Sequence, residues 1–177
     1  VENTVEKGTI EVQKTWKDED NRTALRPESL TYELYRVKTA GETKDMLVDT
    51  AVVNTAPDFK KVWNNVPVKN PDGSDAQYYV VETKPEGSNL DKYTTTYTVS
   101  VNSGTPASYD TAKDSAKALT ADTTNSVTVT NKYVPVRGRV DAKKIWEDYS
   151  NKYDLRPDQL YLTLKYQVEG TTTWTTV

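Results

Sequence analysis

Hydrophobic and polar residues alternate along short stretches of this chain, with turn-forming residues between the stretches. Because successive side chains of a strand face opposite sides, the alternation predicts strands near 8–16, 30–37, 45–53, 59–66, 77–83, 93–101 and 126–133. Residues 102–125 interrupt the pattern, and we expect a surface insertion with one or two helical turns between 111 and 120. Seven short strands predict an all-β fold, an immunoglobulin-like sandwich or a partly open barrel.

The sequence also repeats itself. Residues 8–36, GTIEVQKTWKDEDNRTALRPESLTYELYR, align without gaps on residues 138–166, GRVDAKKIWEDYSNKYDLRPDQLYLTLKY. A repeat of this length predicts tandem domains: a leader at 1–7, a complete domain at 8–133, a linker at 134–137 and the start of a second domain at 138–177. The linker is short and contains a proline, so we expect domains strung end to end. Since about 40 residues rarely bury enough surface to be stable, we also expect the second domain to continue past Val177.

Composition excludes several classes of function. The chain has no histidine and no cysteine, which removes the usual zinc sites, thiol nucleophiles, Ser-His-Asp triads and disulfides. Its net charge is −3 with scattered basic residues, so neither nucleic acid nor an anionic membrane is an expected partner. No apolar stretch approaches the ~20 residues that cross a bilayer, and any export signal or anchor is expected outside this sequence. Residues 18–21 lack the glycine and distant glutamate of a calcium loop, which predicts a solvated turn and no metal site.

A lysine interrupts the apolar row of the first predicted strand. Ile10, Val12, Lys14 and Trp16 share one face, and the copy repeats this row as Val140, Ala142, Lys144 and Trp146. The row predicts core packing, not sugar stacking, for its tryptophans. An isolated lysine of this kind usually extends its head to water. Recurrence at Lys144 favours burial instead, and a buried ammonium must lose its charge, find a partner or react.

Two other predicted strands carry one polar residue among inward-facing apolar ones: Glu82 in 77–83 and Asn131 in 126–133. If these groups meet Lys14, desolvation favours a neutral amine and a protonated acid. The amine could attack the Asn131 carboxamide while Glu82 polarises the carbonyl and transfers protons, releasing ammonia and leaving an amide bond. This chemistry needs no cofactor and happens once. The alternative is a buried Lys14–Glu82 salt bridge with Asn131 as a hydrogen-bond partner.

Five motifs surround these residues: VQKTW at Lys14, LRP at 25–27, WNNVP at 63–67, YYVVE ending at Glu82, and VTNKY at Asn131. Together, and in this order, they resemble the B-type domains of collagen-adhesin-like surface proteins (CnaB domains). The resemblance covers residues 8–133 and, in the copy, only the lysine and LRP segments. It implies a CnaB-type β-sandwich in which Lys14 and Asn131 are joined by an isopeptide bond that Glu82 catalyses. It also implies that Lys144 is the crosslink lysine of the second domain.

The resemblance implies an extracellular, cell-wall-anchored adhesin or pilus of a Gram-positive bacterium. We expect a structural stalk or spacer whose partners are neighbouring domains of the same surface protein. The alternative is a module that binds a host extracellular-matrix or cell-surface protein through the 102–125 insertion or the loop at 38–46. The polar composition of the insertion favours the spacer, because binding surfaces usually expose aromatic or apolar groups. A turnover enzyme finds no support, since the reactive residues are consumed by their own reaction, and pilin and adhesin stalk both stay open.

Overall fold

The computed structural model describes residues 5–21, 24–54, 59–84, 87–133, 138–167 and 170–177. The chain divides into two compact units, Val1–Val134 and Pro135–Val177, and each is described by itself. The predicted linker at 134–137 lies outside the described residues, as do residues 1–4 of the predicted leader. The assignment of one complete domain and the start of a second stays a prediction.

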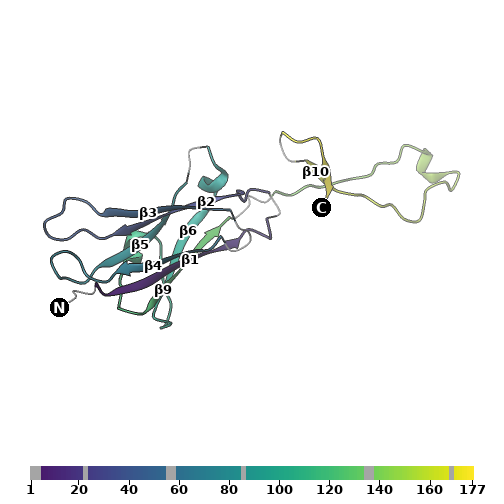
Figure 1. The fold of residues 1–177 in the computed structure, drawn as a ribbon. Helices are drawn as coiled ribbons and strands as arrows, with labels where there is room; N and C mark the ends of the chain where they lie inside the picture. The colour runs from purple at the N-terminus through teal and green to yellow at the C-terminus, as the bar shows by residue number, and fades with distance from the viewer. Residues whose placement is uncertain (1–4, 22–23, 55–58, 85–86, 134–137, 168–169) are drawn as a thin grey trace. The chain divides into compact units, whose positions relative to one another are not determined.

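The first unit is a sandwich of two β-sheets (Figure 1). One sheet has the strand order β4-β1-β9-β6-β7, and the facing sheet has the order β3-β2-β5-β8. The long strands are β1 (Lys7–Lys17), β2 (Leu30–Arg36), β3 (Met46–Val53), β4 (Lys61–Pro67), β5 (Gln77–Glu82), β6 (Thr94–Val101) and β9 (Thr124–Lys132). A 3-10 turn, η1 (Asn89–Lys92), precedes β6. These strands confirm the predicted all-β sandwich and the approximate position of every predicted strand.

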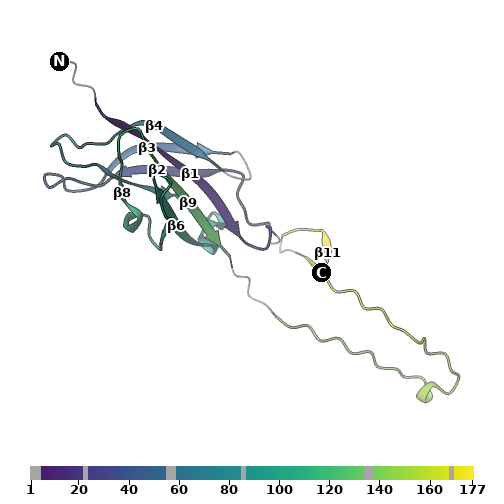
Figure 2. The same ribbon diagram turned by 90° about the horizontal axis from the view of Figure 1, so that it is seen from below.

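The first strand and the last strand of this unit are neighbours. β1 pairs with β9 in parallel, in a continuous register from Thr9 opposite Thr124 to Lys17 opposite Lys132. Figure 2 shows the two strands, purple and green, running side by side along the five-stranded sheet. β4 flanks β1 and β6 flanks β9, both antiparallel. The two ends of the sandwich sequence therefore meet at the centre of one sheet.

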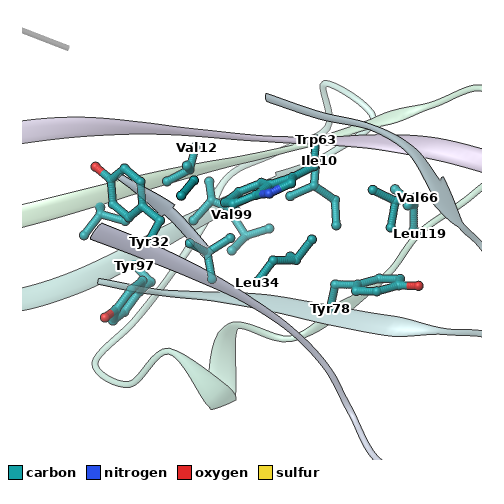
Figure 3. Close-up of a cluster of buried hydrophobic side chains, with 14 of the residues drawn as sticks. Ile10, Val12, Tyr32, Leu34, Trp63, Val66, Tyr78, Tyr97, Val99 and Leu119 are labelled. Atoms are coloured by element: carbon teal, nitrogen blue, oxygen red, sulfur yellow. The ribbon is translucent and has the colours of Figure 1, made fainter. Parts of the chain in front are cut away.

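The hydrophobic core lies between the two sheets (Figure 3). Burial alternates along β2, where Leu30, Tyr32 and Leu34 are buried and the residues between them are partly exposed. Ile10 and Val12 of β1 face this row from the other sheet. The period-two pattern in the sequence thus identified the inward face of β1 correctly.

Residues 102–125 hold two short strands and one 3-10 turn: β7 (Ala107–Tyr109), η2 (Lys113–Ser115) and β8 (Lys117–Ala118). β7 extends the first sheet beside β6, and β8 pairs with β5 at the edge of the second. Most of the segment is exposed, as expected for an insertion, but Ser115 and Leu119 are buried and Leu119 belongs to the core. Strands of two or three residues are too short to show alternation, so the sequence did not predict this packing.

The second unit contains a 3-10 turn, η3 (Tyr149–Asn151), and a hairpin of β10 (Lys165–Gln167) and β11 (Trp174–Thr176). Residues 138–147 form no strand here, and Val140 of the predicted inward row is 71% exposed. Trp146 is only partly buried, so the prediction that it packs in a core is wrong for this unit. The physical reason is that no strand described in this unit covers that row.

Candidate crosslinking site

Lys14 lies on the inward face of β1, in the row that begins with Ile10 and Val12. Only 5% of the residue is exposed, and its side chain is completely buried. Its Nζ atom lies 4.8 Å from the centre of the Trp16 ring, the next residue in the row. The predicted burial of Lys14 is confirmed, and its stem does not carry the amine to solvent.

Glu82 reaches Lys14 from the opposite sheet. It is the last residue of β5, and its Oε1 atom lies 2.6 Å from Lys14 Nζ, with both side chains fully buried. β5 belongs to the facing sheet, so Glu82 and Lys14 do not lie on neighbouring strands. A glutamate can therefore contact the lysine across the core, because inward side chains of the two layers meet there.

Asn131 lies on the strand beside Lys14 and is completely buried. Lys14 pairs with Val129 and Trp16 pairs with Asn131, which places Asn131 one inward position beyond Lys14 on the same face. Thr95 of β6, paired with Asn131 on its other side, donates a hydrogen bond of 2.8 Å from Oγ1 to Asn131 Oδ1. All three predicted site residues thus have buried side chains in one core.

The polar atoms of this core are incompletely hydrogen-bonded. Within the described structure, Lys14 Nζ, both carboxylate oxygens of Glu82 and Asn131 Nδ2 make no hydrogen bond, despite the short Lys14–Glu82 contact. The Tyr32 hydroxyl, on the residue paired with Glu82, is also buried without a partner. Buried polar groups normally find partners, and exceptions often mark functional sites. A static salt bridge would leave this desolvation cost uncompensated.

Burial adjusts the protonation of the amine. Removal from water lowers the pKa of Lys14 from 10.5 to about 8, although the adjacent Glu82 carboxylate acts in the opposite direction. Burial also raises the pKa of Tyr32, which keeps this phenol neutral. A substantial fraction of the neutral, nucleophilic amine is therefore present near physiological pH.

In an uncrosslinked variant, Lys14 should make the free energy of unfolding depend on pH. The pKa of Lys14 is about 8 in the folded chain and near 10.5 when unfolded, so between these values only the unfolded chain holds the proton. Stability must then rise with pH across this interval. Between pH 7.5 and pH 10, we expect the free energy of unfolding of Asn131→Ala to rise by about 2 to 3 kcal/mol more than that of Lys14→Met/Asn131→Ala. Urea unfolding of both variants measures the two values. If the difference in unfolding free energy between the two variants stays constant with pH, the Lys14 amine is not desolvated.

Aromatic residues cover the end of the core where the three groups lie. The Trp16 ring makes edge contacts with Phe59 and Tyr93, at centroid distances of 6.2 and 5.2 Å. The Arg26 guanidinium lies over the same ring, 5.6 Å from its centre. The Lys14 amine and the Arg26 guanidinium therefore both lie close to the Trp16 ring.

A buried ion pair anchors this cover. Arg26 donates to Asp18 from Nε at 2.8 Å and from Nη2 at 2.5 Å, and the Tyr93 hydroxyl donates to the same carboxylate at 3.0 Å. These hydrogen bonds lower the pKa of Asp18, with Arg26 the main cause. Asp18 is 2% exposed, so the prediction of a solvated turn is wrong at this residue. Its partners Arg26 and Tyr93 lie 8 and 75 positions away along the chain, and no local sequence pattern points to Tyr93.

The same loop structure occurs in the second unit. Arg156 donates to Asp148 at 2.8 and 2.6 Å, and Lys144 Nζ lies 4.7 Å from the centre of the Trp146 ring. Positive φ angles recur at matching positions of the two loops, Glu19, Asp20, Asn21 and Ala24 in one and Tyr149, Ser150, Asn151 and Asp154 in the other. The loop conformation is therefore set by local hydrogen bonds. Lys144 itself is exposed and has neither a Glu82 nor an Asn131 counterpart among the described residues of its unit.

A family comparison identifies the kind of domain that carries this site. Residues 10–106 match the model of the Cna protein B-type domain. The chain belongs to this family. The match includes Lys14 and Glu82, and Asn131 lies beyond it.

Similar proteins include adhesins and pilins. The collagen adhesin of Staphylococcus aureus is 27% identical over 155 residues, which is 86% of this chain and 10% of that protein. A crystal structure of a single B repeat unit of the Staphylococcus aureus collagen-binding surface protein is 22% identical with a TM-score of 0.45, covering 73% of this chain and 51% of that one. The major pilin from Streptococcus pyogenes is 18% identical with a TM-score of 0.41, covering 72% and 48%. This B-type domain chain thus spans a tenth of the curated relative and about half of each solved chain.

Two other kinds of site receive no support from the described residues. No group of three or more acidic side chains gathers there in a way that could hold a metal ion. In the same part of the chain, no helix is both long enough and apolar enough to cross a membrane.

Proposed function

We propose that this B-type domain is a structural stalk unit of a Gram-positive cell-surface adhesin or pilus, closed by an isopeptide bond between Lys14 and Asn131. Glu82 is the catalytic acid and base of the bond-forming step. The observation that carries the proposal is the completely buried contact between Lys14 Nζ and Glu82 Oε1, in the core that also buries Asn131.

The proposed reaction begins with proton transfer from the Lys14 ammonium to Glu82. The neutral amine attacks Cγ of Asn131, Glu82 delivers a proton to Nδ2 and takes one from the attacking nitrogen, and ammonia leaves as the new amide forms. Fixed neighbours in a folded core supply the high effective concentration that this slow exchange needs. The reaction occurs once per chain, so the domain is not a turnover enzyme.

The hydrogen-bonding pattern supports this proposal over a permanent salt bridge. A buried ion pair is tolerated when its remaining lone pairs and protons are satisfied. Apart from their mutual contact of 2.6 Å, Nζ and both carboxylate oxygens have no hydrogen-bond partner among the described residues. Conversion to an amide removes the buried charge of Lys14 and releases the unpaired Nδ2 group of Asn131.

The position of the bond fits a load-bearing role. Lys14 is near the start of the sandwich sequence and Asn131 is near its end, yet their strands are adjacent. In domains strung end to end, a pulling force enters through β1 and leaves through β9. An amide between these strands transmits the force directly and cannot be reduced, unlike a disulfide. The names of the relatives, a collagen adhesin and a major pilin, support a location on the outer surface of a Gram-positive cell.

Peptide mapping tests the proposal. Trypsin digestion of the denatured chain should release one branched peptide that contains Lys14 joined to Asn131, with ammonia lost. The Lys14→Arg variant is the matched control, because it keeps the positive charge and cannot form the branch. Recovery of only linear peptides around both residues from the wild-type chain would overturn the proposed bond.

A second candidate function, binding of a host protein, is favoured by the surface near the 38–46 loop. Met46, Leu47 and Val48 of β3 are 45, 48 and 39% exposed, and Met46 and Val48 line a surface hollow beside Arg36. Collagen is the ligand to test, since the curated relative is named a collagen adhesin. If this surface binds, Met46→Asp should weaken retention on immobilised collagen, with Val52→Asp as an exposed control elsewhere on β3. Equal retention of both variants, or none by the wild type, would exclude this candidate.

A further inference from the structure

A threonine on the strand beside Asn131 contacts the atom that would carry negative charge during crosslinking. Thr95 shares the inward row of β6 with Tyr97 and Val99, both of which are buried. It pairs with Asn131 across the antiparallel β6–β9 ladder. Its Oγ1 atom donates a hydrogen bond of 2.8 Å to Asn131 Oδ1. The threonine is thus placed by the sheet register, not by a mobile loop.

The Thr95 hydroxyl occupies the position at Asn131 Oδ1 that was first expected for Glu82. Glu82 was expected to polarise the Asn131 carbonyl, but its Oε1 atom lies 2.6 Å from Lys14 Nζ, and apart from that contact neither carboxylate oxygen has a hydrogen-bond partner among the described residues. The donor found at Oδ1 is the Thr95 hydroxyl. We propose that Thr95 is a second catalytic residue of the self-crosslinking reaction, in which its hydroxyl stabilises the oxyanion on Asn131 Oδ1. This inference rests on the proposed function, because it concerns the same bond.

The chemistry gives the hydroxyl a defined task. Attack of Nζ on Cγ forms a C–N bond and moves the carbonyl electron pair onto Oδ1, which becomes an oxyanion. Glu82 delivers its proton to Nδ2 and takes one proton from the attacking nitrogen. The oxyanion electron pair then re-forms the C=O bond as the Cγ–Nδ2 bond breaks and ammonia leaves. Atoms and charge balance, and the Thr95 proton stays on its own oxygen throughout.

The hydrogen bond from Thr95 Oγ1 to Asn131 Oδ1 should be stronger in the transition state than before the reaction. A neutral hydroxyl bonded to an amide oxygen gains strength as that oxygen acquires negative charge, especially in a dry core. Donation to Oδ1 also fixes the rotation of the carboxamide about its Cβ–Cγ bond. The leaving nitrogen, Nδ2, is then the end without a hydrogen-bond partner.

The test is a time course of crosslinking in the full chain. Protein purified from inclusion bodies in denaturant starts uncrosslinked, and dilution starts folding and reaction together. Acid-quenched samples report the ammonia loss by intact mass, and far-UV circular dichroism reports the folded fraction. Thr95→Val removes the hydroxyl at nearly constant shape, and Thr95→Ser retains it. Thr96→Val is the matched control, because it makes the same change one residue along, on the opposite face of β6.

We expect Thr95→Val to slow ammonia loss per folded molecule by about 100-fold, the usual effect of removing one oxyanion donor. Thr95→Ser should stay within about tenfold of the wild type, and Thr96→Val should match it. If Thr95→Val does not fold, Thr95→Ala is compared with Thr95→Ser in the same way. A hydroxyl-free variant that folds and reacts as fast as Thr96→Val overturns the role of Thr95 alone. A folded wild type that never loses ammonia contradicts the proposed function itself.

Discussion

Glu82→Gln is expected to give a folded domain without the Lys14–Asn131 bond and to lower its free energy of unfolding by about 4 to 5 kcal/mol. The glutamine has nearly the shape of the glutamate but cannot transfer the proton. The bond would close a loop of roughly 120 residues, and the stated loss is the chain-entropy value for a loop of that size. Guanidinium unfolding of the variant and the wild type, followed by tryptophan fluorescence, measures the difference.

Two control variants distinguish the effect of losing the isopeptide bond on stability from the effect of changing a charge. Glu28→Gln makes the same chemical change at an exposed position and should leave stability unchanged. Lys14→Met/Glu82→Gln removes the bond and the buried amine together, so it lacks the cost of an unpaired lysine. If this double variant unfolds at the same guanidinium concentration as the wild type, the wild type contains no stabilising bond.

Pulling the chain by its ends should reveal the same bond mechanically. A Glu82→Gln domain is expected to lengthen by roughly 400 Å when it unfolds, the contour of the segment between Lys14 and Asn131. In the wild type that segment is bypassed, because the force passes from β1 to β9 through the amide. Single-molecule force spectroscopy on the chain between two reference domains measures the length gained per event.

The contrast between these two chains is the decisive mechanical result. The wild type should give the events of the reference domains and no long extension of its own. Lys14→Arg, which keeps the positive charge without the nucleophile, should behave like Glu82→Gln. A long extension in the wild type at moderate force would mean that β1 and β9 are held by hydrogen bonds alone.

Alternation in the sequence predicted the burial of the three polar residues of the candidate site. Lys14, Glu82 and Asn131 each interrupt an apolar row, and all three are buried. This worked because side chains two apart share a face in every strand, whatever sheet the strand joins. The same rule would have pointed to Thr95, which lies two residues before Tyr97 in an inward row. It drew no attention because threonines are common along this chain.

Sheet membership and long-range contacts could not be predicted from the same pattern. Period-two alternation does not say whether Glu82 faces Lys14 from a neighbouring strand or from the opposite layer. Asp18 was assigned to a solvated turn because residues 18–21 lack the pattern of a calcium loop, but Tyr93 and Arg26 bind its buried carboxylate. Trp146 shares the pattern of Trp16 and both are partly buried, but only Trp16 packs against a core, since core packing also needs the strands that cover a row. Each of these failures concerns partners that are distant in sequence or not found among the described residues of the unit.

The intact mass of the denatured wild-type chain reports whether the bond between Lys14 and Asn131 has formed. We expect a mass lower by one ammonia than the sequence requires, and a full sequence mass for Lys14→Arg, Glu82→Gln and Asn131→Ala after allowance for each substitution. A single loss is expected, because Lys144 has no acid or asparagine counterpart in its described unit. A wild-type mass equal to the sequence mass, in protein shown to be folded, would contradict the isopeptide bond and leave a buried polar network in its place.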